Sequence, residues 1–279
     1  MDPTWPPWWP RWKNVTIFDL EDCSGIVLGG VRLTGKIVRV SLSRSQLDRL
    51  GQRLRVEEIT AKDLRSLDEY RRSFLEPYAN TAEIIRNELK LEPTGRPAKS
   101  TTSIRDKLRR ESIRLSQIQD IAGCRIIVPD IIIQDETVRA LVDKLGDVKI
   151  FDRRAKPSHG YRAVHLIAQC ADRPIEIQVR SAFQHIWAEL SEKIADMFDP
   201  ALKYGNGPEQ WSAWLSRISN SVAEGERLQM KLHNLKIKAG DVSHVTEVSD
   251  LLRQLEREVV EATTHYQNAL RLIIAEMSE

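Results

Sequence analysis

Apolar residues in the first half of the chain recur at helical spacing. Between Thr60 and Leu91 they stand three or four positions apart, which predicts helical structure with a break or kink at Pro77. A loop rich in proline and glycine over residues 93–97 should follow. A second helix is expected over Thr102–Gln117.

Short apolar runs after residue 120 predict strands. The run Cys124–Val128 follows Gly123 and is typical of a buried strand. Three more strands are expected, at Val148–Asp152, Tyr161–Cys170 and Arg173–Arg180. Helices over Asp135–Leu145 and Ala182–Met197 are expected to cover the sheet. Strands mixed with helices in this way predict an α+β layered domain.

The pattern from Trp211 onward is purely helical. Gly240 and Asp241 separate two long segments, and apolar residues from Val245 to Met277 advance mostly by alternating threes and fours. This spacing is the seam of a coiled coil, which needs a partner helix. A hairpin with the preceding segment is the simplest partner. Self-association through these helices, or binding of another protein, is the alternative.

These patterns divide the chain into three parts. Residues 1–54 are expected to be a leader of uncertain order, with a short hairpin possible over residues 25–40; residues 55–207 form the mixed domain and 208–279 a helical extension. The first 12 residues hold four of the seven tryptophans among prolines, and they lack the features of a signal peptide. Three interpretations of these 12 residues stay open. They could be a disordered leader, they could lie ahead of the natural start of the protein, or they could be an aromatic tail that binds a partner.

Composition narrows the class of protein. The 279 residues are 41% apolar and 29% charged, which excludes a wholly disordered, collagenous or membrane-embedded chain. No uncharged apolar run approaches the length of a membrane span. The three cysteines form no CxxC pair, which fits a soluble protein of the reducing cytoplasm. The formal net charge is only +2, so any nucleotide site must come from local clustering.

One such cluster is basic. Residues 96–125 carry eight lysines and arginines against three acids. On a helix, Ser103, Lys107, Arg110 and Arg114 would line one stripe and could grip an anion from one direction. Ser103 is also a plausible N-cap, and a helix N-terminus favours phosphate. The alternative is a solvated basic face.

Acidic and polar side chains supply a second cluster. Asp120 precedes a buried strand, and strand alternation places Glu176, Gln178 and Arg180 on one face of another. Mg²⁺ usually takes one or two carboxylates together with substrate phosphates. Alternatively, the strand with Glu176, Gln178 and Arg180 is a half-exposed edge strand, and Asp120 is an ordinary turn residue.

A third cluster follows a turn. Lys156 to Gly160 have turn chemistry, and Tyr161 and His165 then share one side of the next strand. An aromatic ring at the rim of a cleft can stack on a nucleotide base. A packed tyrosine with a satisfied hydroxyl is the more ordinary interpretation.

Together these segments, over about Leu54–Gly207, resemble the synthetase domain of RelA/SpoT-type alarmone synthetases, especially the small single-domain forms and their toxic branch. The motifs that carry the resemblance are Lys99, Ser103-Ile104, Lys107-Leu108 and Arg110; Asp120 to Arg125; Gly160 to His165; and Glu176 to Arg180. The resemblance implies a mixed sheet of nucleotidyltransferase type. It also implies ATP-dependent transfer of a β,γ-pyrophosphate to the ribose 3′-hydroxyl of GDP or GTP, which makes (p)ppGpp.

The resemblance further assigns roles to residues. Catalysis would fall to Glu176, Asp120 and Gln178, with Mg²⁺ held by Asp120 and Glu176. ATP would be bound by Arg96, Lys99, Ser103, Lys107, Arg110 and Arg125. The acceptor would be bound by Lys156, Tyr161, Arg162, His165 and Arg180, with the tyrosine stacking on the base.

Departures from the family pattern lie on the acceptor side. Lys156 precedes Pro157 instead of following it, and Gln184-His185 precede Trp187 where many members have asparagine. These features look more like the toxic branch, some of whose members pyrophosphorylate the 3′ end of tRNA, and an antitoxin partner would then be expected. An alternative hypothesis of a different functional class is that the chain has no catalytic activity. It would then sense a nucleotide and act on a partner through its coiled coil.

Overall fold

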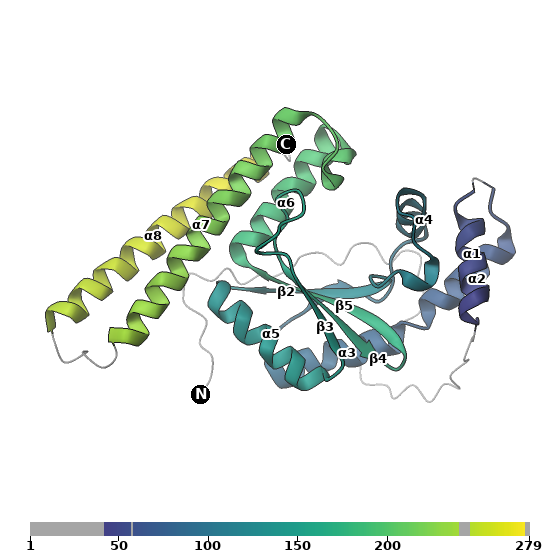
Figure 1. Ribbon diagram of the computed structural model, residues 1–279, viewed down its shortest axis with the longest axis horizontal. Helices are drawn as coiled ribbons and strands as arrows, with labels where there is room; N and C mark the ends of the chain where they lie inside the picture. Colours follow the sequence, from purple (N-terminus) through teal and green to yellow (C-terminus); the bar gives the residue numbers. More distant parts are fainter. Residues whose placement is uncertain (1–41, 57, 240–245, 277–279) are drawn as a thin grey trace. The chain divides into compact units, whose positions relative to one another are not determined.

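The computed structural model describes residues 42–56, 58–239 and 246–276, which lie in one unit, Val40–Glu279 (Figure 1). The hairpin expected over residues 25–40 and most of the expected leader lie outside the described residues. The described part of the chain is a mixed sheet flanked by helices, followed by two long helices. The α+β class expected from the sequence is therefore confirmed.

The sheet has five strands in the order β1-β2-β5-β4-β3. Their bounds are β1 Thr94–Arg96, β2 Ala122–Val128, β3 Val148–Asp152, β4 Val164–Cys170 and β5 Arg173–Ser181. The central pair β2–β5 is parallel, and the other pairs are antiparallel. The short edge strand β1 replaces part of the loop expected over residues 93–97, since three exposed residues show no alternation that a sequence pattern could reveal.

One face of the sheet is apolar and covered by helices. Helices α3 (Leu75–Leu89) and α5 (Ile131–Leu145) lie against this face (Figure 1), where Ile177, Val179 and Leu166 are fully buried. Helix α5 begins earlier than expected because the side chain of Asp130 accepts hydrogen bonds from two backbone N–H groups of the first turn. Burial of this face leaves the opposite face for polar side chains.

Helices α4 (Thr101–Arg110) and α6 (Ala182–Met197) lie on that opposite side (Figure 1). The bounds of α6 are those expected from the sequence, and Ser181 and Gln184 form a capping box at its start. Helix α4 is shorter than expected, and its N-cap is Ser100, not Ser103. The helix ends at Arg110, so Arg114 does not continue its stripe and instead lies near Asp48, with 3.7 Å between Nε and Oδ2.

The N-terminal helices pack into the core. Helix α1 (Arg44–Leu54) lies in the segment assigned to the leader, yet three of its leucines are buried with residues of α2 (Ala61–Arg72) and α4. The folded part of the chain thus begins before residue 55. The single helical region expected from residue 60 divides between α2 and α3, and Pro77 occupies the first turn of α3, where a missing N–H costs no helical bond.

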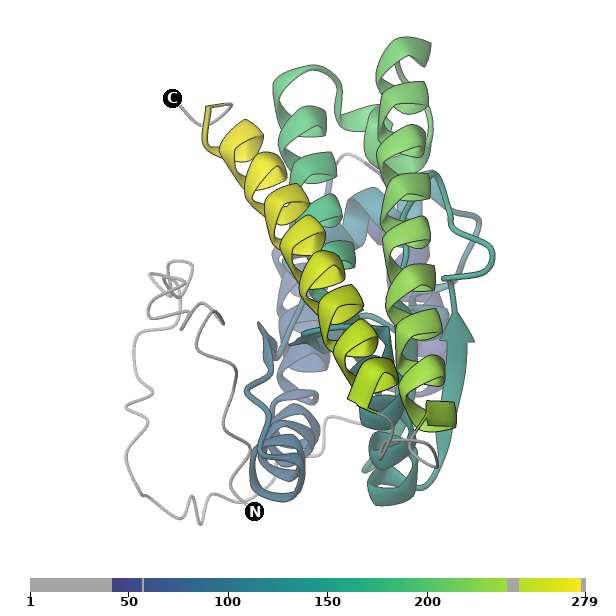
Figure 2. The same cartoon turned by 90° about the vertical axis from the view of Figure 1, so that its left-hand side faces the viewer.

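The two C-terminal helices are α7 (Glu209–Ala239) and α8 (Thr246–Glu276). They pack against each other and against α6 (Figure 2), where Leu215, Val222 and Leu270 are buried. The coiled-coil seam therefore finds its partner within the chain. Within the described ranges, no helix combines the length and the apolar character needed to cross a bilayer.

Helix α1 can be tested as a part of the core. Leu50 is 1% exposed, so Leu50→Ala should lower the free energy of unfolding by about 3 kcal/mol through lost burial and a residual cavity. Leu64 on α2 is 43% exposed, and Leu64→Ala should cost less than about 1 kcal/mol. Urea denaturation measures both, and equal losses would contradict the placement of α1.

Candidate active site

Strand β5 presents a row of polar side chains to the face between α4 and α6. Along this strand Ile175, Ile177 and Val179 are buried on the apolar side, while Glu176 and Gln178 alternate with them. The alternation expected from the sequence is confirmed: Ile177 and Val179 join the core beneath the sheet, and Ile175 joins the core formed with α1, α2 and α4.

A closed ring of hydrogen bonds joins five residues on this face. Gln178 Nε2 donates to Glu176 Oε2 at 3.0 Å, and Arg180 Nη2 donates to Gln178 Oε1 and to the Tyr161 hydroxyl, both at 3.0 Å. His165 closes the ring, with Nε2 2.9 Å from the Tyr161 hydroxyl and Nδ1 2.9 Å from Glu176 Oε1. The ring gathers five predicted residues from two separate motifs, Gly160 to His165 and Glu176 to Arg180.

Glu176 is ionised within this ring. Burial raises the pKa of its carboxyl, but the hydrogen bond and charge of His165 and the hydrogen bond from Gln178 more than offset it, so the pKa is lowered. An ionised carboxylate only accepts hydrogen bonds, so Nδ1 of His165 carries a proton. His165 thereby holds Glu176 in one orientation.

A second acidic group is clamped by lysines. Asp120 Oδ2 lies 2.8 Å from Lys99 Nζ, and Oδ1 lies 2.9 Å from Lys107 Nζ. Burial raises the pKa of Asp120, whereas the charges and hydrogen bonds of both lysines lower it to a net value of about 2. Arg71 Nε donates to the backbone oxygen of Lys99 at 2.8 Å and so helps to fix this segment.

The two carboxylates are coupled electrostatically. The charge of Asp120 raises the pKa of Glu176, which requires the two groups to lie within reach of each other. Two ionised carboxylates offer the hard oxygen ligands that Mg²⁺ prefers, so the donor set fits a magnesium ion completed by phosphates. Within the described part of the chain, no group of three or more histidine, cysteine, aspartate or glutamate side chains could hold a metal by itself.

The turn before Tyr161 is fastened to α7. Gly160 has a φ of 87°, and a Cβ there would lie 2.7 Å from Trp187, so glycine is required. Ser219 of α7 donates to the Gly160 oxygen at 2.6 Å and accepts from Arg162 Nε at 3.0 Å. Arg162, predicted to bind the acceptor, here anchors the turn.

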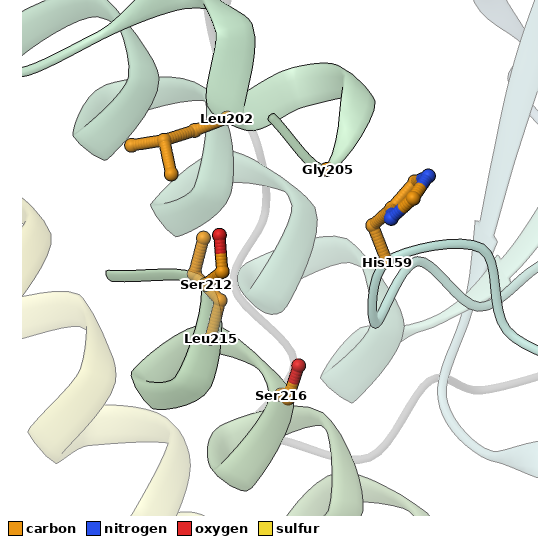
Figure 3. Close-up of a pocket in the computed structure, with 6 residues that line it drawn as sticks. All are labelled: His159, Leu202, Gly205, Ser212, Leu215 and Ser216. Atoms are coloured by element: carbon orange, nitrogen blue, oxygen red, sulfur yellow. The ribbon is translucent and has the colours of Figure 1, made fainter. Parts of the chain in front are cut away.

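A small cavity of about 60 Å³ lies behind this turn (Figure 3). It lies among the turn, the 3₁₀ helix Pro200–Tyr204 and the start of α7, and it is lined by His159, Leu202, Gly205, Ser212, Leu215 and Ser216. The His159 ring lies so close to Gly205 that any side chain there would collide with it. The cavity of about 60 Å³ has room for a few water molecules but is far smaller than a nucleotide site.

The remaining predicted ligands differ in their exposure and in their contacts. Arg96 is exposed at the end of β1, opposite Gly123 of β2, and Lys156 is exposed in the loop after β3. The hydroxyl of Ser103 accepts from Ser100 at 2.8 Å. Arg110 is stacked on an aromatic ring: its guanidinium carbon lies 3.7 Å from the centre of the Tyr204 ring.

Sequence patterns did not identify His185 of α6 as a site residue. Its side chain is 7% exposed, and burial followed by the charges of Arg180, Arg125 and Arg271 lowers its pKa to about 3. Arg271 comes from α8, far along the chain. The packing of α8 on α6 brings Arg271 near His185, and local sequence patterns could not reveal this, although Gln184-His185 differ from the family pattern.

Comparison with known families agrees with this arrangement. Residues 95–195 match the family model described as a region found in RelA / SpoT proteins. Residues 95–195 thus resemble a region found in RelA / SpoT proteins. The matched residues include every residue of the hydrogen-bonded ring and both lysines that clamp Asp120.

Individual relatives resemble parts of the chain. A curated protein of Mycobacterium bovis is 38% identical over 121 residues, which cover 42% of this chain and 44% of that protein. This chain thus spans less than half of the length of the curated relatives that it matches. The crystal structure of small alarmone synthetase 1 from Bacillus subtilis aligns with a TM-score of 0.46 and 25% identity, covering 64% of this chain and 100% of that one. The same protein bound to its product pppGpp aligns with a TM-score of 0.45 and 25% identity, over 60% and 98%.

Because His185 is buried in its uncharged form, we expect the protein to lose stability in acid. The unfolded chain gains a proton on His185 below about pH 6.5, whereas the folded chain resists protonation until about pH 3. The free energy of unfolding should therefore fall by about 2 kcal/mol between pH 7 and pH 5 from this residue.

Urea denaturation of His185→Gln at both pH values measures this contribution as a difference from the wild type. His265→Gln, which changes an exposed histidine of α8, should keep the wild-type dependence on pH. Identical pH dependence in His185→Gln and the wild type would contradict the burial of an uncharged His185.

Proposed function

We propose that this chain is an ATP-dependent 3′-pyrophosphokinase that transfers the β,γ-pyrophosphate of ATP to the ribose 3′-hydroxyl of GDP or GTP. The observation that carries the proposal is the pair of ionised, coupled carboxylates, Asp120 and Glu176, on one face of the sheet. Lysines from α4 and the loop before it adjoin this pair. The RelA/SpoT match over residues 95–195 supports the same chemistry.

The donor side of the site suits a triphosphate. Phosphoryl-type transfer depends mainly on positioning and on neutralising charge, and Lys99 and Lys107 supply charge beside Asp120. Mg²⁺, when bound, would add further neutralisation of the phosphates. Arg96, Ser103, Arg110 and Arg125 complete the proposed ATP ligands. ATP binding at Arg110 would replace the contact with Tyr204.

The acceptor side is built around Tyr161. Arg180 lies over one face of its ring, with 5.0 Å from the guanidinium carbon to the ring centre, so a guanine base would stack on the other face. Lys156 and His165 are the other proposed acceptor ligands, while Arg162 acts by holding the turn. Glu176, already ionised, would orient or deprotonate the 3′-hydroxyl, with Gln178 fixing its second oxygen.

The proposed synthetase domain covers residues 55–207 together with helix α1, and residues 208–279 form the helical extension. The proposed compartment is the cytoplasm, where ATP and GTP are available. One assay separates the possible acceptors: labelled ATP offered to GDP, GTP, ATP and tRNA side by side. A labelled guanosine product supports the proposal, whereas label on tRNA alone would replace it with a translation-blocking activity, for which a neutralising antitoxin would be the expected partner.

Glu176→Gln should abolish transfer. The substitution keeps the shape and the hydrogen bond from His165 but removes the negative charge, so kcat should fall by roughly a hundredfold or more. Glu261→Gln, an exposed change on α8, should leave kcat unchanged. Product formation from γ-labelled ATP measures both variants. If Glu176→Gln formed as much product as the wild type, Glu176 would have no part in the transfer. If neither protein formed any product, the chain would instead be a catalytically silent module that senses a nucleotide.

Tyr161→Ala should impair use of the acceptor far more than binding of ATP. The lost stacking is worth about 1 to 3 kcal/mol, which appears as a raised KM for GDP. Tyr161→Phe removes only the hydroxyl from the ring of hydrogen bonds and should retain most of the stacking. Equal losses of GDP and ATP affinity in Tyr161→Ala would count against this placement of the acceptor.

A further inference from the structure

Helix α7 buries two polar side chains, Ser219 and Glu226, on one side. They are 1% and 3% exposed, and they stand seven residues apart, which is about two turns of a helix. Val222 lies between them on the same side and is also buried. Buried polar groups are normally hydrogen-bonded, so the partners of Ser219 and Glu226 show which segments this side of α7 holds.

Ser219 holds the residues on both sides of Tyr161. Its hydroxyl donates to the backbone oxygen of Gly160 at 2.6 Å and accepts from Nε of Arg162 at 3.0 Å. Arg162 also donates through Nη1 to the backbone oxygen of Arg154, in the loop after β3. One hydroxyl of α7 thus fixes the turn that carries the tyrosine.

Glu226 holds the segment that follows Arg180. Its Oε1 accepts from the Ser181 hydroxyl at 2.5 Å and from Gln184 Nε2 at 2.8 Å. Ser181 comes directly after Arg180 and forms the capping box of α6 with Gln184. Gln184 Oε1 also accepts from Gln134 of α5 at 2.8 Å. One carboxylate oxygen of α7 therefore fixes the end of β5 beside Arg180.

The two residues that α7 holds in this way contact each other. Arg180 Nη2 donates to the Tyr161 hydroxyl at 3.0 Å, and its guanidinium carbon lies 5.0 Å from the centre of the tyrosine ring. Tyr161 precedes β4 and Arg180 belongs to β5, so their contact depends on how these two segments are held. A surface that is already ordered loses less conformational entropy when its ligand binds. Holding both segments should therefore raise the affinity for a base that stacks on the ring.

Packing alone does not explain the burial of these polar groups. Apolar residues such as Leu215 and Val222 already pack α7 into the core that it shares with α6 and α8. Burial raises the pKa of Glu226, although the hydrogen bonds from Ser181 and Gln184 lower it, so burying the carboxylate costs free energy. An apolar side chain of similar size would avoid this cost. The two polar side chains therefore indicate a need for a specific geometry.

We propose that Ser219 and Glu226 of α7 are positioning residues of the acceptor site. Through the turn before β4 and the cap of α6, they hold Tyr161 and Arg180 in the arrangement on which the acceptor base stacks. The inference rests on the proposed function for the identity of this ligand. Both residues lie beyond the stretch 95–195 that matches the family model, so the helical extension completes the acceptor side of the mixed domain.

The donor side is held by different contacts. Lys99 and Lys107 bond to Asp120, and Arg71 of α2 donates to the backbone oxygen of Lys99. These groups come from α2, α4 and the segments beside them. A change in α7 should therefore weaken binding of the acceptor and leave binding of ATP as it is.

Steady-state kinetics of the full chain tests this difference. Ser219→Ala removes both bonds to the turn, and Glu226→Leu removes both bonds to the cap at a similar side-chain volume. Each should raise KM for GDP roughly fivefold, as the loss of one net hydrogen bond implies, with KM for ATP unchanged. Glu226→Gln keeps an oxygen that can accept from the cap, so it should recover most of the wild-type KM. Asn220→Ala and Glu224→Gln, which are exposed changes on α7, should match the wild type.

A purely structural role of these residues predicts a different result. Fewer folded molecules lower the rate at saturation per total protein but leave KM unchanged. Thermal unfolding reports the folded fraction of each variant, and Ser219→Ala decides if Glu226→Leu does not fold. The inference is overturned if Ser219→Ala keeps the wild-type KM for GDP or raises KM for GDP and ATP equally. It is also overturned if KM for GDP is as high in Glu226→Gln as in Glu226→Leu.

Calorimetric titration of GDP, with Mg²⁺ and a saturating non-hydrolysable ATP analogue, separates this inference from the proposed function. The wild type should bind GDP, and Ser219→Ala should bind it roughly fivefold more weakly. If this difference appears but the chain transfers nothing from ATP, the positioning role stands and the proposed function is refuted. If the wild type forms product and Ser219→Ala binds GDP as tightly as the wild type, the positioning role is refuted and the proposed function stands. A wild type that binds no GDP overturns the inference.

Discussion

The closed ring of hydrogen bonds on strand β5 is the constraint on which the site depends. Each member is hydrogen-bonded to its neighbours in the ring, so the orientation of Glu176 is determined by His165 and Gln178 together. Hydrogen bonds in a partly buried network of this kind are stronger than in water, because the surroundings have a lower dielectric constant. The ring therefore also fixes where β4 and β5 must lie relative to each other.

The sheet and its helices are arranged around this requirement. The apolar residues between the ring members are buried beneath the sheet, and this anchors β5 in the core. Helix α7 secures the turn that carries Tyr161 through Ser219, and α6 begins directly after Arg180. The C-terminal hairpin is thus joined to the polar face by contacts as well as by packing, which differs from a separate coiled-coil module.

The parts of the fold and of the candidate site that depend on local sequence patterns could be predicted. Alternation along β5 identified both its core face and its polar face, and the bounds of α6 followed from helical spacing and its cap. Strand β1 could not be found, because three residues contain no period. Helix α1 was assigned to the leader because its few leucines become informative only when α2 and α4 cover them. The seam spacing predicted that α8 folds back on α7, but it did not predict that α8 also packs on α6, where it brings Arg271 near His185.

The contact between Arg110 and Tyr204 affects the affinity with which a nucleotide can bind. The guanidinium of Arg110 on α4 lies over the ring of Tyr204, which belongs to the segment after α6, so these two segments are in contact in the ligand-free chain. An incoming nucleotide that uses this arginine must compete with the protein's own aromatic ring. The observed association constant of the nucleotide is then the intrinsic constant multiplied by the fraction of molecules in which Tyr204 does not contact Arg110.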